Sequence, residues 1–200
     1  MGEALSLGDP LPRSFFARDA LVVARALVGT YLVIDGKRPR VSRIVETEAY
    51  RGPTDLACHA RAGMTKRTRT LLGPAGHAYV FLVYGMHDCF NLVCFGEGKG
   101  HAVLVRAGEP TRGLANDART DGPGRFSRAM GITRADDGLD VVEGGRLYVA
   151  PRVGRAKISV SARVGVAYAG EMAEAPWRFF DAQSRWVSRP SARMIGLGRV

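Results

Sequence analysis

The sequence of 200 residues has few cysteines, few lysines and no long apolar run. Its three cysteines, Cys58, Cys89 and Cys94, lack C-x-x-C spacing, which predicts free thiols rather than a disulfide framework or a zinc site. The longest apolar stretch, 20–34, is shorter than the roughly 20 residues that a membrane-spanning helix needs, and Arg25 interrupts it. Because no charged and apolar leader opens the chain, we expect a cytoplasmic protein without a membrane partner.

Acidic side chains are outnumbered, since 19 aspartates and glutamates stand against 29 lysines and arginines, a formal net charge of +10. An excess of this size on a small protein favours a polyanionic partner or an anionic surface. Only four of the basic residues are lysines, and arginine forks suit phosphates and the edges of bases. The 46% apolar and 24% charged residues are typical of a folded protein rather than a disordered one.

Short runs of β-branched and aromatic residues, each bounded by glycine, proline or aspartate, predict β-strands. Asp35-Gly36 is a hairpin signal between the first two runs, and the glycine-rich turn at 96–100 predicts a second antiparallel connection. The predicted strands cover 30–34, 41–50, 78–84, 90–95, 102–107 and 158–166.

Helices are predicted in three places. Asp19 suits the N-cap of a helix that Gly29 closes, and the segments 109–119 and 125–132 predict two further short helices. Residues 1–12 predict a flexible lead-in without apolar periodicity, and no linker divides 13–200, which we expect to form a single domain. We therefore predict an α+β fold around a mainly antiparallel sheet.

The segment R-I-V-E-T-E-A-Y-R-G-P, which begins at Arg43, is the densest in groups suited to chemistry. Because side chains alternate along a strand, Glu46, Glu48 and Tyr50 share one face. Two carboxylates beside an aromatic ring at a strand end are typical of a catalytic cleft, where a desolvated carboxyl acts as general acid or base. The alternative is a surface strand whose carboxylates form salt bridges with Arg43 and Arg51.

A basic loop follows this strand and favours contact with nucleic acid. Between 65 and 70, cations alternate with hydroxyls, a combination that can hydrogen-bond to several phosphates. The alternative is an ordinary solvated loop. The candidate phosphate-binding residues are Thr65, Lys66, Arg67 and Arg69.

The tip of the next predicted hairpin carries Tyr84 and Met86, an amphipathic aromatic and a flexible apolar side chain. Both suit a wedge between stacked bases, and the alternative for Tyr84 is a packed corner aromatic. Tyr79 and Phe81 share a strand face that forms either simple core or a base-stacking wall.

One candidate metal site can be drawn from the sequence. The histidines are scattered, but Glu46, Glu48 and His59 could hold a hard cation and support a metal-dependent hydrolase or nuclease. We expect neither a metal nor another cofactor.

Taken in order, these segments resemble the alkyladenine (3-methyladenine) DNA glycosylase family. The resemblance extends from about Leu11 to Ser188 and depends on several collinear blocks rather than on one motif. These blocks are Arg43–Tyr50, Gly52-Pro53, His59, Tyr84-Gly85-Met86, Asn91, Leu104–Ala107 with Glu109-Pro110, and Ala162–Val166 with Gly170-Glu171.

The resemblance implies a monofunctional DNA glycosylase that flips alkylated or deaminated purines out of duplex DNA. Such an enzyme hydrolyses the N-glycosidic bond with water and initiates base excision repair. The resemblance also implies a curved sheet with flanking helices and a protruding β-hairpin, a monomer and, in a bacterium, association with the nucleoid. A strand-cleaving enzyme would need an amine nucleophile, and only Lys66 lies near the motifs. A nucleic-acid binder without activity and the metal-dependent hydrolase are the alternatives.

The family's site residues carry over position by position. Glu48 matches the general base that deprotonates the attacking water, and Tyr84 matches the residue inserted through the minor groove. Thr65 falls at a phosphate-contacting position. The pocket residues implied are Tyr50, which stacks on the base, His59, which hydrogen-bonds beside it, Phe81 on the stacking wall, Asn91, which helps reject guanine, and Arg106, beside the backbone and the water.

The chain departs from the family at three positions. Phe81 lacks the phenolic hydroxyl of a tyrosine, His87 replaces an aromatic residue, and Met64 stands where a phosphate-binding arginine is sometimes found. These departures leave the reaction class intact and bear on which lesions are accepted.

Overall fold

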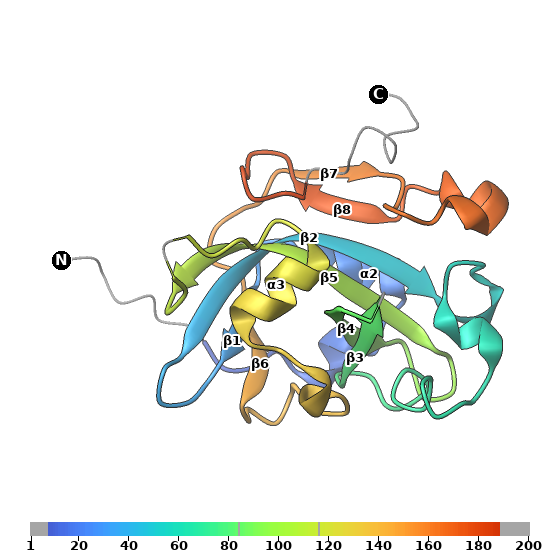
Figure 1. The fold of residues 1–200 in the computed structure, drawn as a ribbon, viewed down its shortest axis with the longest axis horizontal. Helices are drawn as coiled ribbons and strands as arrows, with labels where there is room; N and C mark the ends of the chain where they lie inside the picture. The colour runs from blue at the N-terminus through green and yellow to red at the C-terminus, as the bar shows by residue number, and fades with distance from the viewer. Residues whose placement is uncertain (1–7, 84, 116, 189–200) are drawn as a thin grey trace.

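One curled antiparallel sheet of eight strands organises the part of the chain that the computed structural model describes, residues 8–83, 85–115 and 117–188. The strands are β1 (Tyr31–Ile34), β2 (Arg40–Arg51), β3 (Ala78–Val83), β4 (His87–Cys94), β5 (His101–Arg112), β6 (Leu147–Ala150), β7 (Ile158–Ser161) and β8 (Arg178–Asp181). They lie in the order β3-β4-β5-β2-β1-β6, and β8 pairs with both β2 and β7 (Figure 1). The predicted α+β class and the mainly antiparallel curved sheet are confirmed.

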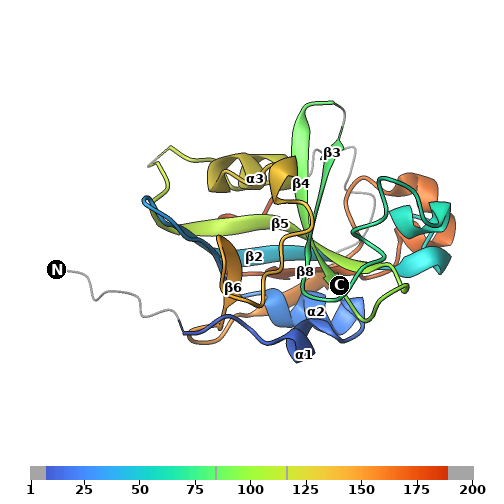
Figure 2. The ribbon, with the colours of Figure 1, turned by 90° about the horizontal axis from the view of Figure 1, so that it is seen from below.

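Helices cover both sides of the central strands. They are α1 (Arg13–Phe16), α2 (Ala20–Leu27) and α3 (Pro123–Met130). Figure 2 shows α1 and α2 on one side of β2 and β5, with α3 on the other. Asp19 caps α2 as predicted, because its carboxylate accepts a hydrogen bond of 2.9 Å from the Leu21 amide. Phe16, Phe90 and Phe126 are fully buried in the main apolar core.

The hairpin of β3 and β4 protrudes from the sheet. The inner half of β4 pairs with β5 from Asn91, opposite Leu104, to Cys94. The outer half, 87–90, pairs with β3 alone among the described residues. Figure 2 shows the free end of this hairpin extending beyond the other strands, as predicted.

The helix predicted at 109–119 is wrong. β5 instead continues as a strand to Arg112, with Pro110 opposite Ser42 of β2. Proline donates no amide to a strand ladder, and the register of the two strands shifts at this point, between Val41 and Ser42. Long-range pairing with β2 therefore overrides the local helical pattern of this segment.

The other boundaries differ less. The strand predicted over 158–166 ends at Ser161, and β6 and β8 were not predicted because four-residue runs carry little periodicity of their own. The helix predicted over 125–132 is confirmed as α3, and both antiparallel connections are confirmed by the pairing of β1 with β2 and of β4 with β5. Residues 1–7 of the predicted lead-in lie outside the described residues.

Within the described ranges, none of the helices has the length and apolar character needed to traverse a bilayer.

Candidate active site

Strands β2 and β5 bring two carboxylates and a guanidinium together in the middle of the sheet. Glu46 lies opposite Ala107 and Glu48 lies opposite Leu104, which places Arg106 of β5 between the two acids. Both carboxylate side chains are fully buried, and Arg106 is 7% exposed. Charges removed from water must be paired, and Arg106 forms an ion pair with each acid, while the buried Arg178 pairs with Glu46.

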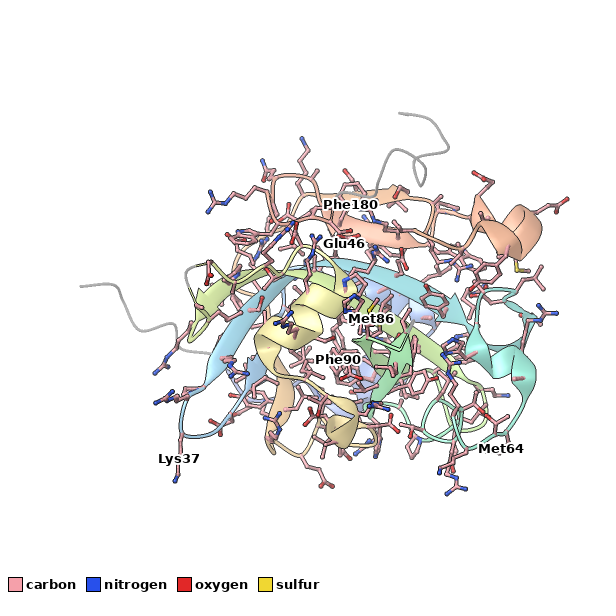
Figure 3. The ribbon with its side chains drawn as sticks, in the orientation of Figure 1. Lys37, Glu46, Met64, Met86, Phe90 and Phe180 are labelled. Atoms are coloured by element: carbon pink, nitrogen blue, oxygen red, sulfur yellow. The ribbon has the colours of Figure 1, made fainter. Side chains whose placement is uncertain are left out.

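Glu46 is saturated with hydrogen bonds. Its Oε1 accepts from Nε of Arg106 over 2.8 Å and from Nε of Arg178 over 2.7 Å, while the Ser188 amide donates to Oε2 over 2.6 Å. Burial would raise the pKa of Glu46, but the positive charges of Arg106 and Arg178 outweigh it and hold that pKa below its ordinary value. Figure 3 shows Glu46 next to Phe180, the residue opposite it in β8. Glu46 is therefore an ionised anchor for the two arginines rather than a group that exchanges protons near neutral pH.

Glu48 has a less complete set of partners. Its Oε1 lies 3.3 Å from Nη1 of Arg106 and accepts the Val164 amide over 2.7 Å, and its Oε2 accepts the Tyr50 hydroxyl over 3.0 Å. A carboxylate offers about four acceptor positions, so these contacts leave room for another donor such as water. Burial, and then the charge of Glu48, raise the pKa of Tyr50 well above its ordinary value, so the phenol stays protonated and donates.

A cavity of about 760 Å³ opens beside this cluster. Glu48 itself has no exposed surface, but its partners Tyr50, Arg106 and Val164 all line the cavity. The volume lies within the range of about 300–1,000 Å³ that is usual for small-molecule pockets. The walls come from the end of β2, the segment around His59, the β3–β4 hairpin, the residues 121–125 at the start of α3, and 164–166.

A glycine lets the segment that carries His59 pack closely against the sheet. Gly100, just before β5, has a φ of +66°, and a Cβ at this position would lie 2.5 Å from the Cβ of Ala60. The Cys58 thiol also lies within hydrogen-bond range of the Gly100 carbonyl, at 3.5 Å. This close approach holds the short helical turn of 59–62 at the edge of the cavity.

Aromatic rings form one wall of the cavity. The His59 and Phe81 rings meet edge to face with centroids 4.5 Å apart, and His59 Nδ1 lies 3.0 Å from the Tyr79 hydroxyl. Asn91 donates its side-chain amide to the Tyr79 carbonyl over 3.1 Å. The structure thus brings together the predicted substrate-binding residues Tyr50, His59, Phe81, Asn91 and Arg106, whose individual roles stay predictions.

Arg67 points into the cavity, whereas the sequence placed it among the phosphate contacts of the basic loop. Its Nη2 lies 3.2 Å from His59 Nε2, and its Cζ lies 5.2 Å from the centroid of the Phe81 ring. Because a guanidinium only donates, His59 Nε2 accepts and Nδ1 carries the ring proton towards Tyr79. Burial, and then the charge of Arg67, lower the pKa of His59 to about 4, so the imidazole is neutral at neutral pH.

Changing Arg67 to glutamine should raise the pKa of His59 from about 4 towards its ordinary value of 6.5, because a nearby positive charge is lost. Burial of the ring persists, so we expect a partial recovery. An NMR titration of the His59 ring measures the shift. The control is Arg69→Gln, which removes the same charge from an exposed side chain of the same loop that lines no part of the cavity. Equal shifts in the two variants would contradict the contact.

The other predicted DNA-contacting residues that the structure describes do not line the cavity. Lys66 and Arg69 are exposed, and Thr65 lines a smaller adjoining hollow of about 430 Å³. Met86 is 73% exposed at the tip of the β3–β4 hairpin (Figure 3), a suitable place for a side chain that contacts DNA. Tyr84, the predicted wedge, lies outside the described residues.

The structure excludes one alternative that the sequence left open and disfavours another. The surface-strand alternative is wrong, because Glu46 and Glu48 are fully buried while Arg43 and Arg51 pair with other carboxylates. The proposed cation site has unsuitable donors, since two guanidinium groups already hold Glu46 and would repel a metal ion. Among the residues that can be described, no three His, Cys, Asp or Glu side chains are grouped to share an ion.

Sequence reasoning missed several residues of the cavity. Tyr168, at 73% exposure, and Ser188 line it without belonging to a recognisable local motif. Gly122-Pro123-Gly124 is a sequence signal that could have marked the start of α3 as a close approach of the backbone. In the structure, a Cβ at Gly124 would lie 2.8 Å from His87. That glycine permits α3 to approach the protruding hairpin and close one side of the cavity.

Comparison with known proteins gives consistent matches. Residues 14–185 match the model of a family described as methylpurine-DNA glycosylase (MPG). A protein of Myxococcus xanthus is 52% identical over 184 residues, which cover 90% of this chain and 93% of the relative. A protein of Methanocella arvoryzae is 50% identical over 191 residues, covering 90% and 96%, and one of Legionella pneumophila strain Lens is 44% identical over 182 residues, covering 90% and 98%. All three carry the name "Putative 3-methyladenine DNA glycosylase".

Proposed function

Because the chain belongs to the methylpurine-DNA glycosylase family, we propose that it flips damaged purines into the 760 Å³ cavity and cleaves them from the sugar with a water activated by Glu48. Its activity is that of a DNA glycosylase, a hydrolase that acts on the N-glycosidic bond. The proposed substrates are alkylated purines, such as 3-methyladenine, and deaminated purines, such as hypoxanthine.

The position of Glu48 behind the cavity wall is the observation that supports this proposal. A general base must lie within hydrogen-bond reach of the water whose proton it takes. Tyr50, Arg106 and the Val164 amide each contact the Glu48 carboxylate and also border the cavity, so a water among them would touch both the carboxylate and a bound nucleotide. The fixed charge of Arg106 orients the carboxylate, and Glu46 in turn fixes Arg106.

The aromatic wall would hold the flipped base. Extrusion of a nucleotide costs a few kcal/mol, and less for a poorly paired damaged base, so stacking must offset only part of that cost. Tyr50 and Phe81 offer π faces in the cavity, and attraction between such a face and a cationic alkylated purine is worth about 0.5–2 kcal/mol. Deaminated purines are neutral and would depend on stacking and on hydrogen bonds from Arg67 or Asn91.

In the proposed reaction, Glu48 takes a proton from water as the water oxygen bonds to the sugar C1′ and the bond from C1′ to the purine nitrogen breaks. The negative charge of Glu48 also stabilises the positive charge that develops on the sugar. Purines alkylated at N3 or N7 leave without a formal negative charge. Among the described residues, no lysine lines the cavity, which supports water rather than an amine as the nucleophile.

The positive charge of the chain supports duplex DNA as the partner. With a formal charge of +10, each phosphate that the protein neutralises would add roughly −0.9 to the slope of log affinity against log salt. Insertion of Tyr84 into the gap left by the flipped base belongs to the same proposal, with Met86 beside it. A monomer belongs to the same proposal, because flipping one nucleotide requires a single copy of the cavity.

Base release from a duplex with one 3-methyladenine tests this function. We expect the wild-type protein to release the free base, to leave the strand intact until the abasic site is cleaved by alkali, and to keep its full rate in EDTA. A parallel duplex with hypoxanthine tests the deaminated substrates. Tight binding without base release from either duplex would favour the nucleic-acid binder, and loss of activity in EDTA would favour the metal-dependent hydrolase.

A further inference from the structure

A second buried ion pair lies behind the Glu48 cluster. Arg163 donates from Nη1 to Oδ2 of Asp55 over 2.6 Å and from Nη2 to Oδ1 over 2.9 Å, and neither side chain has exposed surface. Neither residue lines the cavity. Burying two charges is costly even when they pair, and Arg163 Nε is a further buried donor without a partner among the described residues. The stability of the fold alone therefore does not explain why Asp55 and Arg163 are buried.

The Arg163 guanidinium fixes the ring that donates to Glu48. Its Cζ lies 4.7 Å from the centroid of the Tyr50 ring and 4.7 Å from that of Trp177. Nη1 also donates to the Ala49 carbonyl over 3.0 Å, which ties the guanidinium to the strand that carries Tyr50. The Tyr50 hydroxyl is thereby held where it reaches the carboxylate of Glu48.

The same side chain fixes the backbone donor on the other oxygen of Glu48. Val164 directly follows Arg163, and its amide donates to Glu48 Oε1 over 2.7 Å. If the guanidinium shifted, the backbone of 163–164 would shift with it. Two of the contacts that orient Glu48, from Tyr50 and from Val164, thus depend on one arginine.

Asp55, the partner of Arg163, fixes the backbone of the turn that follows β2. Its carboxylate accepts the amides of Arg51 over 3.1 Å and Ala57 over 3.0 Å, which fixes the turn leading from the end of β2 to His59. Burial would raise the pKa of Asp55, but the hydrogen bonds and charge of Arg163 lower it, and the pKa of Arg163 is raised in return. The pair therefore stays ionised at neutral pH.

We propose that Asp55 and Arg163 form a positioning pair for the glycosylase reaction, which aligns the Tyr50 hydroxyl and the Val164 amide on Glu48 without touching the substrate. The inference rests on the proposed role of Glu48. It predicts that disturbing the pair slows bond cleavage while base entry and DNA binding persist.

Arg163→Lys tests the pair, because lysine keeps the positive charge but loses the planar fork and the stacked surface. We expect the single-turnover rate of base release to fall about 30- to 100-fold, since a displacement of about 1 Å can cost a hundredfold in rate. The dissociation constant for a duplex with an abasic-site analogue should stay within about threefold, because that duplex carries no base to stack on Tyr50 and the basic surface is unchanged. Fluorescence of 1,N6-ethenoadenine in the duplex reports base entry, which should persist.

The control is Arg146→Lys, which makes the same change in an ion pair with Asp136, 2.9 Å from Nε to Oδ1, whose arginine is half-exposed and lies outside the cavity. It should leave rate and affinity unchanged even where its melting temperature falls. Asp55→Asn provides a second variant should Arg163→Lys fail to fold, and it should also lower the rate more than the affinity.

Each rate is measured at a temperature at which thermal melting shows the variant to be folded. A wild-type rate in folded Arg163→Lys, or in folded Asp55→Asn where the first variant does not fold, would overturn the proposal. So would parallel losses of rate and affinity, which indicate a purely structural role. Failure of the proposed function is distinguishable, because it would appear as wild-type protein that releases no base.

Discussion

Changing Glu48 to glutamine should lower the single-turnover rate of base release by about 10²–10⁴-fold, the usual contribution of a general base. Glutamine has the size of glutamate, and its carbonyl oxygen can still accept one of the hydrogen bonds from Tyr50 and Val164. It cannot remove a proton from water, and it provides no negative charge beside the sugar. The measurement is the rate of 3-methyladenine or hypoxanthine release with enzyme in excess.

DNA binding by the Glu48→Gln protein should persist, since the change removes one negative charge from a protein that already carries +10. The control is Glu97→Gln, which makes the same change at an exposed glutamate in the turn before β5 and should leave the rate unchanged. A rate equal to that of the wild type in the Glu48→Gln protein would show that Glu48 is not the base.

Changing Arg106 to methionine should destabilise the fold and abolish base release. Methionine fills the volume but leaves Glu48 buried without its guanidinium partner, whereas Glu46 keeps Arg178. Breaking a buried ion pair from one side costs about 3–5 kcal/mol. Urea unfolding measures the loss, and activity is assayed at a temperature at which the variant is folded.

The destabilisation by Arg106→Met should depend on pH. In the wild type, the lowered pKa of Glu46 contributes stability that is fully present above its ordinary value of 4.5 and is lost as the pH falls below it. The variant lacks part of this contribution, so the difference between the proteins should be largest near neutral pH and shrink in acid. Arg119→Met, at an arginine whose side chain is 65% exposed, is the control and should cost almost nothing. An Arg106→Met protein as stable as the wild type would contradict the charge network.

Strand periodicity was sufficient to predict which acids share a face. The alternation of β2 placed Glu46, Glu48 and Tyr50 on one side, and in the structure Glu48 contacts Tyr50 while both acids contact Arg106. What distinguishes the two acids could not be predicted, because it comes from distant parts of the chain. Ser188, which helps saturate Glu46, lies 142 residues away.

The orientation of loop side chains also could not be predicted from the sequence. The basic composition of 65–70 predicts contacts with phosphate, but nothing local determines that Arg67 borders the cavity while Arg69 does not. The partnership of Asp55 and Arg163 spans 108 residues and depends on how the turn after β2 meets the segment that precedes the 3-10 turns at 167–173. Such pairs are properties of the folded chain, and no spacing rule in the sequence marks them.

A crystal structure of the Glu48→Gln protein with a hypoxanthine-containing duplex tests the water-activating role of Glu48 most directly. We expect the purine in the cavity against Tyr50 and Phe81, with an ordered water hydrogen-bonded to the side chain at position 48 and about 3–3.5 Å from the sugar C1′. A purine seated in the cavity with its C1′ turned away from that side chain, and no space for water between them, would contradict the role.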